Sequence, residues 1–276
     1  MKKKLIISLS GVIIISICFT SVAMLKAIYL EDVILNKANT VLDGHIANTP
    51  SRMMIYRDGK HLTAYFILNN DNTEYALTGS YNKITRHFKL YNNDKTISMN
   101  GNIHPNSNSK DYYILSGDYN KKSDEKGEFS FVPAWELTGK SKEDMYKDLG
   151  YNTAQVERFT DYIIALIRIN DKQNLSQLME YPLSTVIEGE TLLLNNEQDF
   201  LTYYDTIMTA DFKSILINSF HRYLWGNYMG IQLGENGRGF LFRMNTDEKD
   251  FRIISISNNS SDYSYPLNED NGITQG

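Results

Sequence analysis

The residue types that most often carry catalysis are present in this sequence, but not at catalytic spacings. An α/β-type serine hydrolase places its nucleophile in a Gly-x-Ser-x-Gly turn, and the chain contains no such run. The histidines show no His-x-x-x-His or His-Glu pairing of the kind that binds zinc. The sequence therefore predicts no catalytic residue, no metal site and no cofactor. The histidines are His45, His61, His87, His104 and His221.

Three polar loops resemble ligand loops and are better explained as turns. Gly234–Gly239 is glycine-rich like a phosphate loop, but it lacks the Gly-Lys-Ser/Thr that holds phosphate and magnesium. Strand-like runs flank it, so it is predicted to be a hairpin turn. Asn70–Glu74 and Asn92–Asp94 offer oxygen ligands without the alternate-position spacing of a calcium loop, and their residue types favour turns.

Composition narrows the classes of partner. The chain has 28 basic and 33 acidic residues and a net charge of −5. This mildly acidic balance, without a long basic block, argues against nucleic acid as a partner. The single cysteine, Cys18, lies in an N-terminal apolar run, so the rest of the chain has no thiol for a disulfide or a thiolate metal site.

The N-terminus predicts export from the cytoplasm. Lys2–Lys4 precede the apolar run Leu5–Phe19, and Ser21 and Ala23 follow in a small-x-small pattern. This is the order of a signal peptide, with cleavage after Ala23. Cleavage removes three lysines and no acidic residue, which takes the net charge from −5 to −8. We expect the product in the periplasm.

A retained anchor stays open as the alternative. The apolar stretch Leu5–Leu25 has about the 20 residues that a helix needs to cross a bilayer. Uncleaved, it would hold the protein at the inner membrane with its bulk outside the cytoplasm. The membrane would then be a partner only through this segment.

Periodicity predicts a β-rich first domain. Residues 27–50 are weakly helical and are predicted to form a connecting helix. Over 51–134 the apolar period becomes two, and turn dipeptides punctuate it at roughly ten-residue spacing. We predict an antiparallel meander of about six or seven strands, a small barrel or sandwich. A repeat centred on Gly79 and Gly117, with a weaker copy at Gly101, predicts strand glycines that let the sheet curl; a ligand surface lined by Tyr81 and Tyr119 is the alternative.

Mixed helical and strand patterns follow a polar linker at 135–151. The domain 152–258 opens with an amphipathic helix after Asn152, capped by Thr153 in this prediction. A short second helix, a strand pair, a third helix capped by Asn196 and three strands complete it. A polar tail, 259–276, is predicted to fray.

This order of elements resembles the NTF2-like (cystatin-like α+β) superfamily, as found in exported bacterial proteins of unknown function. Four segments carry the resemblance: Ile164–Asp171, Leu175–Pro182, Asp199–Ile207 and Trp225–Gly234. The resemblance implies helices packed on a strongly bent antiparallel sheet that forms a cone, and it covers less than half the chain. The predicted fold class is therefore α+β, a β-meander followed by an NTF2-like cone. The first half resembles no family beyond small exported β-modules.

The resemblance also implies where a ligand would bind. Aromatic side chains would line the cone, and they are Tyr162, Tyr204, Trp225, Tyr228 and Phe242. Enzymes on this cone use an acid or a tyrosine in its mouth, where apolar walls tune proton affinity. The candidates for that role are Asp161, Tyr162, Tyr203, Tyr204 and Asp205. Core packing is the competing explanation for the tyrosines.

Three functions follow as hypotheses. The first is a non-enzymatic exported protein that binds a partner of the envelope or an incoming toxin, as an immunity-type protein does. The second is a cone that binds a small ligand or performs simple acid–base chemistry. The third is a structural envelope component that keeps its N-terminal anchor.

Fractionation of cells that express the chain tests the export prediction. We expect a periplasmic product that lacks residues 1–23, because Ser21 and Ala23 suit signal peptidase. A full-length product that stays with the inner membrane would instead establish the anchor.

Overall fold

The computed structural model describes residues 39–69, 72–105, 113–122, 125–187, 190–245, 247 and 249–258. They form two compact units. The first runs to Ser141, and the second comprises Lys142 onwards together with the short stretch Asn69–Asn72. No helix within the described ranges combines the length and the apolarity needed to cross a membrane. The predicted cleavage residues Ser21 and Ala23 lie outside the described residues.

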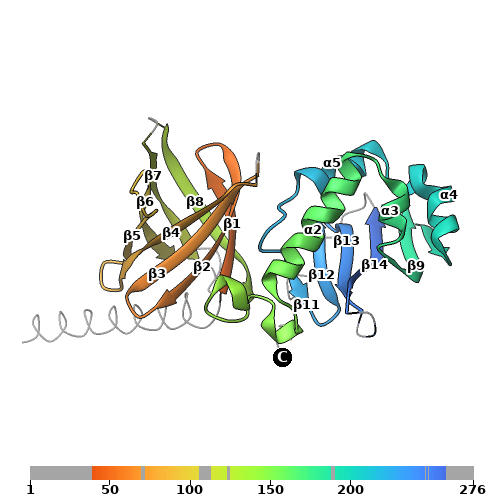
Figure 1. The fold of residues 1–276 in the computed structure, drawn as a ribbon. Coiled ribbons are helices and arrows are strands. Elements are labelled where there is room, and N and C mark those ends of the chain that lie inside the picture. The colour runs from red at the N-terminus through yellow and green to blue at the C-terminus, as the bar shows by residue number, and fades with distance from the viewer. Residues whose placement is uncertain are drawn as a thin grey trace, which may run out of the picture. The chain divides into compact units, whose positions relative to one another are not determined.

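The first unit is a closed β-barrel (Figure 1). Each strand pairs antiparallel with the next, and β8 returns to pair antiparallel with β1. The strands are β1 (Asn39–Ile46), β2 (Thr49–Asp58), β3 (His61–Leu68), β4 (Glu74–Asn82), β5 (His87–Tyr91), β6 (Ile97–Pro105), β7 (Tyr113–Lys121) and β8 (Glu125–Leu137).

Side chains fill the inside of the barrel. Alternate residues of each strand point inward, and the inward set is apolar throughout, from Leu42 in β1 to Phe131 in β8. Phe66 stacks on Tyr75 with ring centroids 4.8 Å apart, and Phe129 lies 5.9 Å from Phe88. An eight-stranded barrel is just wide enough for such side chains to fill it. The interior is therefore a packed core.

Glycines at inward-facing positions allow neighbouring strands of the barrel to approach each other closely. Gly79, Gly101 and Gly117 occupy inward positions, and Gly101 pairs directly with Gly117 across β6 and β7. A Cβ at Gly79 would collide with the carbonyl oxygen of Lys89, and one at Gly117 with that of Asn100. The repeat in the sequence thus marks places where neighbouring backbones approach too closely for a side chain.

The alternative for the repeat, a ligand surface shared by two tyrosines, does not fit the barrel. Tyr119 is 1% exposed and belongs to the interior core, and Tyr81 is partly buried against the same core. Both rings point inward together with the glycines of the repeat. Their role is packing.

The second unit is a six-stranded sheet with helices (Figure 1). Its strand order is β10-β9-β14-β13-β12-β11, and all neighbours are antiparallel except β14, which runs parallel to β9. The elements are η1 (Lys142–Asp144), η2 (Lys147–Leu149), α2 (Thr153–Arg168), α3 (Lys172–Ser176), β9 (Met179–Ile187), β10 (Glu190–Leu194), α4 (Glu197–Ile207), α5 (Ala210–Asn218), β11 (Gly226–Asn227), β12 (Gly230–Glu235), β13 (Arg238–Met244) and β14 (Phe251–Asn258).

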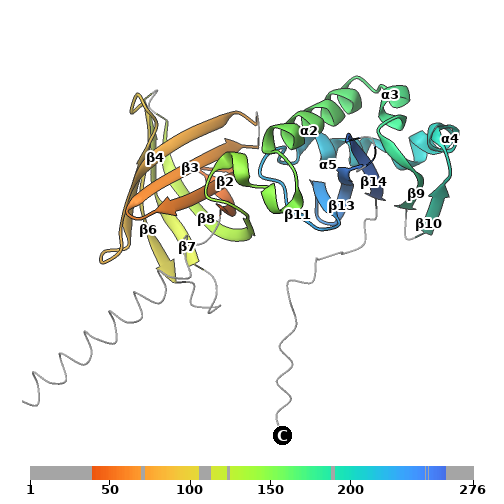
Figure 2. The same cartoon turned by 60° about the horizontal axis from the view of Figure 1, so that its bottom comes forward.

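Aromatic rings join the helices to one face of the sheet. Figure 2 shows α2 lying along that face. Phe159 of α2 packs on Phe242 and Phe251 with centroids 5.1 and 5.4 Å apart, and Phe212 of α5 packs on Phe240 at 5.8 Å. Each large ring buries much apolar area and stabilises the contact by a further ~0.5–1.5 kcal/mol when paired in this way. The layer between helices and sheet is therefore filled by aromatic side chains.

The predicted α+β class is wrong. Strands account for 52% of the structure and helices for 22%, so the protein is mostly β. The first unit has eight strands rather than six or seven. The sheet of the second unit is mixed rather than antiparallel, because β14 pairs parallel with β9. Periodicity shows that a segment is a strand, but it carries no information about which distant strand it pairs with.

Two predicted boundaries also change. Residues 39–46 form β1, and residues 49 and 50 begin β2, so they are not the end of a connecting helix over 27–50, whose first part lies outside the described residues. Strand β8 continues to Leu137, past the predicted end at 134, and the units divide between Ser141 and Lys142. The rest of the predicted linker is folded, since Tyr146 is buried and donates a hydrogen bond of 2.9 Å to the carbonyl of Leu224.

The glycine packing predicts that Gly117→Ala destabilises the barrel by about 1–3 kcal/mol, the usual cost of overpacking. Urea unfolding followed by tryptophan fluorescence measures this in a Trp225→Phe background, where Trp135 of β8 is the remaining tryptophan. Asp118→Ala is the matched control, because Asp118 is the exposed next residue of β7. An unchanged urea midpoint for Gly117→Ala would contradict this prediction. It would show that the neighbouring strands make room for the added methyl group at no cost in stability.

Candidate functional site

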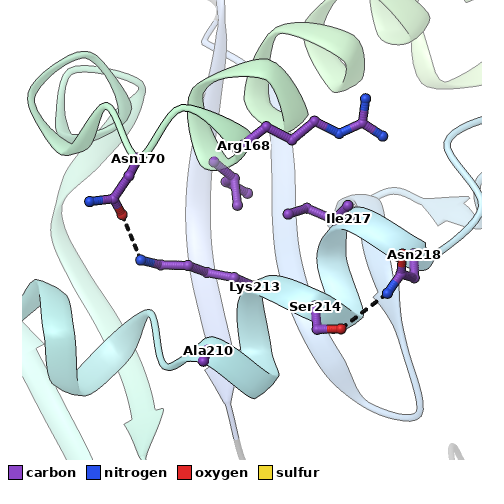
Figure 3. Close-up of a pocket in the computed structure, with 8 residues that line it drawn as sticks. Arg168, Asn170, Ala210, Lys213, Ser214, Ile217 and Asn218 are labelled. Carbon is purple, nitrogen blue, oxygen red and sulfur yellow. Dashed lines mark hydrogen bonds between the residues drawn. The ribbon is translucent and has the colours of Figure 1, made fainter.

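A groove lies between the end of α2 and the outer side of α5 (Figure 3). Its volume is about 540 Å³. Cationic, amide, hydroxyl and aliphatic side chains line it together. They are Ile167, Arg168, Asn170, Ala210, Lys213, Ser214, Ile217 and Asn218.

Local sequence determines where both walls begin and end. The carboxamide of Asn152 caps α2 by accepting a hydrogen bond of 2.9 Å from the amide of Ala154. The helix ends at Arg168, and two residues later Asn170 turns the chain away with a left-handed φ of 56°, a conformation that asparagine tolerates better than most residues. Thr209 caps α5 through the amide of Phe212 at 3.3 Å.

The apolar pattern of α5 turns its polar face to the groove. Phe212 and Leu216 are fully buried one helical turn apart. The residues that follow them, Lys213 and Ile217, therefore share the adjacent face of the helix. That face forms one wall of the groove.

A hydrogen-bond network fixes Lys213. The carboxamide oxygen of Asn170 accepts a hydrogen bond of 2.6 Å from Lys213 Nζ and another of 3.0 Å from the Tyr204 hydroxyl. The Lys213 ammonium also lies 4.8 Å from the centroid of the Tyr204 ring, within cation–π range. One amide oxygen thus joins α4 and α5 to the end of α2.

Burial keeps the Tyr204 hydroxyl protonated. It raises the pKa of Tyr204, and the carboxylates of Asp205 and Asp171 raise it further. A protonated phenol donates its hydrogen bond to Asn170, as the network requires. The support for Lys213 therefore persists through the neutral pH range.

The second cation of the groove is Arg168, in the last turn of α2. Within the described ranges, its exposed guanidinium forms no hydrogen bond or ion pair. In the view of Figure 3, Lys213 reaches towards Asn170 while Arg168 extends the other way, with Ile217 between the two helices. The groove therefore has two positive charges that flank an aliphatic floor.

A buried histidine lies close to this site. His221 is 5% exposed, and its Nε2 lies 3.2 Å from the carbonyl oxygen of Leu216. Burial lowers the pKa of His221 below its ordinary value of 6.5, and the positive charges of Arg168 and Arg222 lower it further. The Leu216 carbonyl and Asp161 oppose this shift. The neutral imidazole is the form that fits the fold.

The five predicted cone-lining residues do not surround one cavity. Phe242 is fully buried in the aromatic layer, whereas Tyr162 and Tyr228 are 47% and 88% exposed. Trp225 is half-buried. Only Tyr204 reaches the groove, and it does so through Asn170. The described structure therefore does not bring the five residues together around one cavity.

The acid–base candidates have other roles or stay on the surface. Asp161 pairs with Arg222 through two hydrogen bonds of 2.7 and 2.8 Å. Tyr203 is 43% exposed on α4, and Asp205 is exposed on the same helix. No group of three or more metal-binding side chains comes together in the described part of the chain.

Sequence reasoning missed every groove residue. Helix α5 carries readable signals, a Thr209 cap followed by apolar residues at Phe212 and Leu216. Arg168 and Lys213, by contrast, lie far apart in the sequence and are ordinary surface types. Only the packing of α5 beside α2 brings them together.

Comparisons with known proteins add no identification. No protein-family model, curated protein or solved structure matches the chain. The resemblance to the NTF2-like superfamily is tested by none of them and stays a prediction.

The lowered pKa of His221 predicts that the second unit loses stability as the pH falls. The unfolded chain takes up a proton near pH 6.5 and the folded chain only at lower pH, so acidification through 6.5 favours unfolding until the folded pKa is reached. Urea unfolding followed by Trp225 fluorescence, in a Trp135→Phe background, should show this loss. It should be smaller in His221→Gln and unchanged in His104→Gln, which alters an exposed histidine of the barrel. Equal slopes in all three proteins would contradict it.

Proposed function

We propose that this chain is an exported, non-enzymatic bacterial binding protein that holds a partner protein in the groove between α2 and α5. The observation that carries the proposal is that two cationic side chains, Arg168 of α2 and Lys213 of α5, line the same groove. Lys213 is half-buried and is already held by Asn170 and Tyr204. Side chains positioned before a partner arrives lose less entropy when it binds.

The chemistry of the groove suits binding better than catalysis. Its polar side chains are a guanidinium, an ammonium, two carboxamides and a hydroxyl. At neutral pH these groups donate hydrogen bonds and attract anions, whereas proton transfer is most efficient from a group whose pKa lies near the working pH. The side chains of Ala210 and Ile217 add apolar contact area.

The alternative of a ligand inside a cone has less support. Phe159, Phe212, Phe240, Phe242 and Phe251 fill the layer between helices and sheet. A small molecule would have to displace these rings. We retain the resemblance to the NTF2-like superfamily as a proposal about the ancestry of the second unit. It does not by itself support a ligand inside that unit.

The proposed location is the periplasm. The support is the order of Lys2–Lys4, the apolar run and the small-x-small site ending at Ala23. A partner in that compartment would be another envelope protein or a toxin on its way in, which would make this chain an immunity-type protein. If the apolar segment were retained, the same groove would work from an inner-membrane anchor, as in a structural envelope component.

Capture from envelope extract tests the proposal. The wild-type protein should recover a partner in stoichiometric amount, and Arg168→Glu combined with Lys213→Glu should abolish recovery by reversing both charges of the groove. Lys249→Glu is the matched control, because Lys249 is an exposed cation of the same unit away from the groove. Equal recovery by the double variant and the wild type would refute a role for the groove.

A further inference from the structure

We infer that the groove recognises an acidic segment of a polypeptide, in which separate acidic side chains pair with Lys213 and with Arg168 and a neighbouring apolar side chain lies on Ile217. This inference rests on the proposed function and specifies the chemistry of its partner. Four features of the described residues lead to it.

The first feature is unused donor capacity. An ammonium has three N–H donors, and Asn170 accepts from Lys213 at 2.6 Å. The Arg168 guanidinium has five donors and no hydrogen-bonded or ion-paired partner within the residues that the structure describes. Both cations can therefore donate to an incoming anion without breaking an interaction shown here.

The second feature is the position of Lys213. Its ammonium is held between the Asn170 carboxamide and the face of the Tyr204 ring, 4.8 Å from the ring centroid. A free surface lysine has to give up rotamer freedom when it forms an ion pair, which cancels much of the gain. Lys213 has already lost that freedom on folding. Its ion pair with a carboxylate is therefore more favourable in net free energy than that of a free surface lysine.

The third feature is the mixed lining. Ala210 and Ile217 give the groove an aliphatic surface beside the cations, and Ser214 and Asn218 add polar groups that hydrogen-bond each other at 3.0 Å. A free phosphate would use the cations and leave Ala210 and Ile217 in contact with water. A polypeptide that alternates acidic and apolar residues uses both surfaces.

The fourth feature is the charge of the whole chain. At −5 it is acidic overall, so nucleic acid and other polyanions are repelled at long range. A short acidic segment can still pair with two local cations, because screening limits the repulsion to about 8 Å at physiological ionic strength. The groove is therefore expected to bind a short acidic segment of a polypeptide in preference to a large, highly negative surface.

Fluorescence anisotropy with a labelled peptide of alternating glutamate and leucine tests the inference on the purified protein. We expect binding that weakens as salt is added, and that weakens about tenfold in Lys213→Gln and in Arg168→Gln, the loss of one charge-assisted hydrogen bond. Lys249→Gln should bind as wild type does. A peptide with glutamine in place of glutamate should bind far more weakly.

Tyr204→Phe tests the positioning of Lys213. It removes the hydroxyl that shares the Asn170 oxygen and leaves every charge in place. We expect weaker peptide binding with an unchanged dependence on salt, since the number of ion pairs stays the same.

Three results would overturn the inference: equal binding of the glutamine peptide, unchanged binding in both charge variants, or displacement of the peptide by inorganic phosphate at equal concentration. Partner capture that depends on the groove, combined with no binding of the acidic peptide, would leave the proposed function standing and reject only the acidic segment. Peptide binding without capture of any partner would leave the acidic-segment inference standing and reject the proposed function.

Discussion

A single carboxamide links three helices of the second unit. Asn170 follows the end of α2 in a left-handed conformation, and its side-chain oxygen accepts hydrogen bonds from Tyr204 of α4 and Lys213 of α5. An amide oxygen has two lone pairs, and both are used here. Without this acceptor, the partly buried hydroxyl of Tyr204 would lose its partner at a cost of roughly 1–3 kcal/mol. Three helices are thus joined at an atom beside the groove.

Side chains fill the interiors of both units. In the barrel, inward glycines bring the strands close enough for Phe66, Phe88 and Phe129 to fill the space. In the second unit, rings such as Phe159 and Phe242 fill the layer between helices and sheet. Interiors packed to this degree resist the entry of a ligand, since any added volume must displace side chains from their preferred rotamers. A shallow groove on helix surfaces is what remains for binding.

The sequence predicted local structure better than pairing or site. Period-two alternation and turn residues are local properties, so runs such as Phe88–Leu90 could be recognised as strand from a few residues. Strand β1 was missed because Val41 and Leu42 are adjacent apolar residues, which fit a helical face as well as a strand. Both residues are buried, but Leu42 belongs to the barrel core and Val41 does not. Because both faces of β1 are buried here, the apolar pattern does not alternate as the prediction required.

The site could not be predicted for a different reason, and that reason bears on how the groove works. Arg168, Asn170 and Lys213 are common surface types, and their chemistry arises only from their juxtaposition. An acidic chain does not attract an acidic partner from a distance, so the groove cannot gain affinity through faster association. Under the proposed function, the affinity of the groove comes from slow dissociation, which donors already held in place when the partner arrives would favour. The hydrogen bond from Lys213 to Asn170 holds one such donor, and the Tyr204 hydroxyl bonds the same acceptor oxygen.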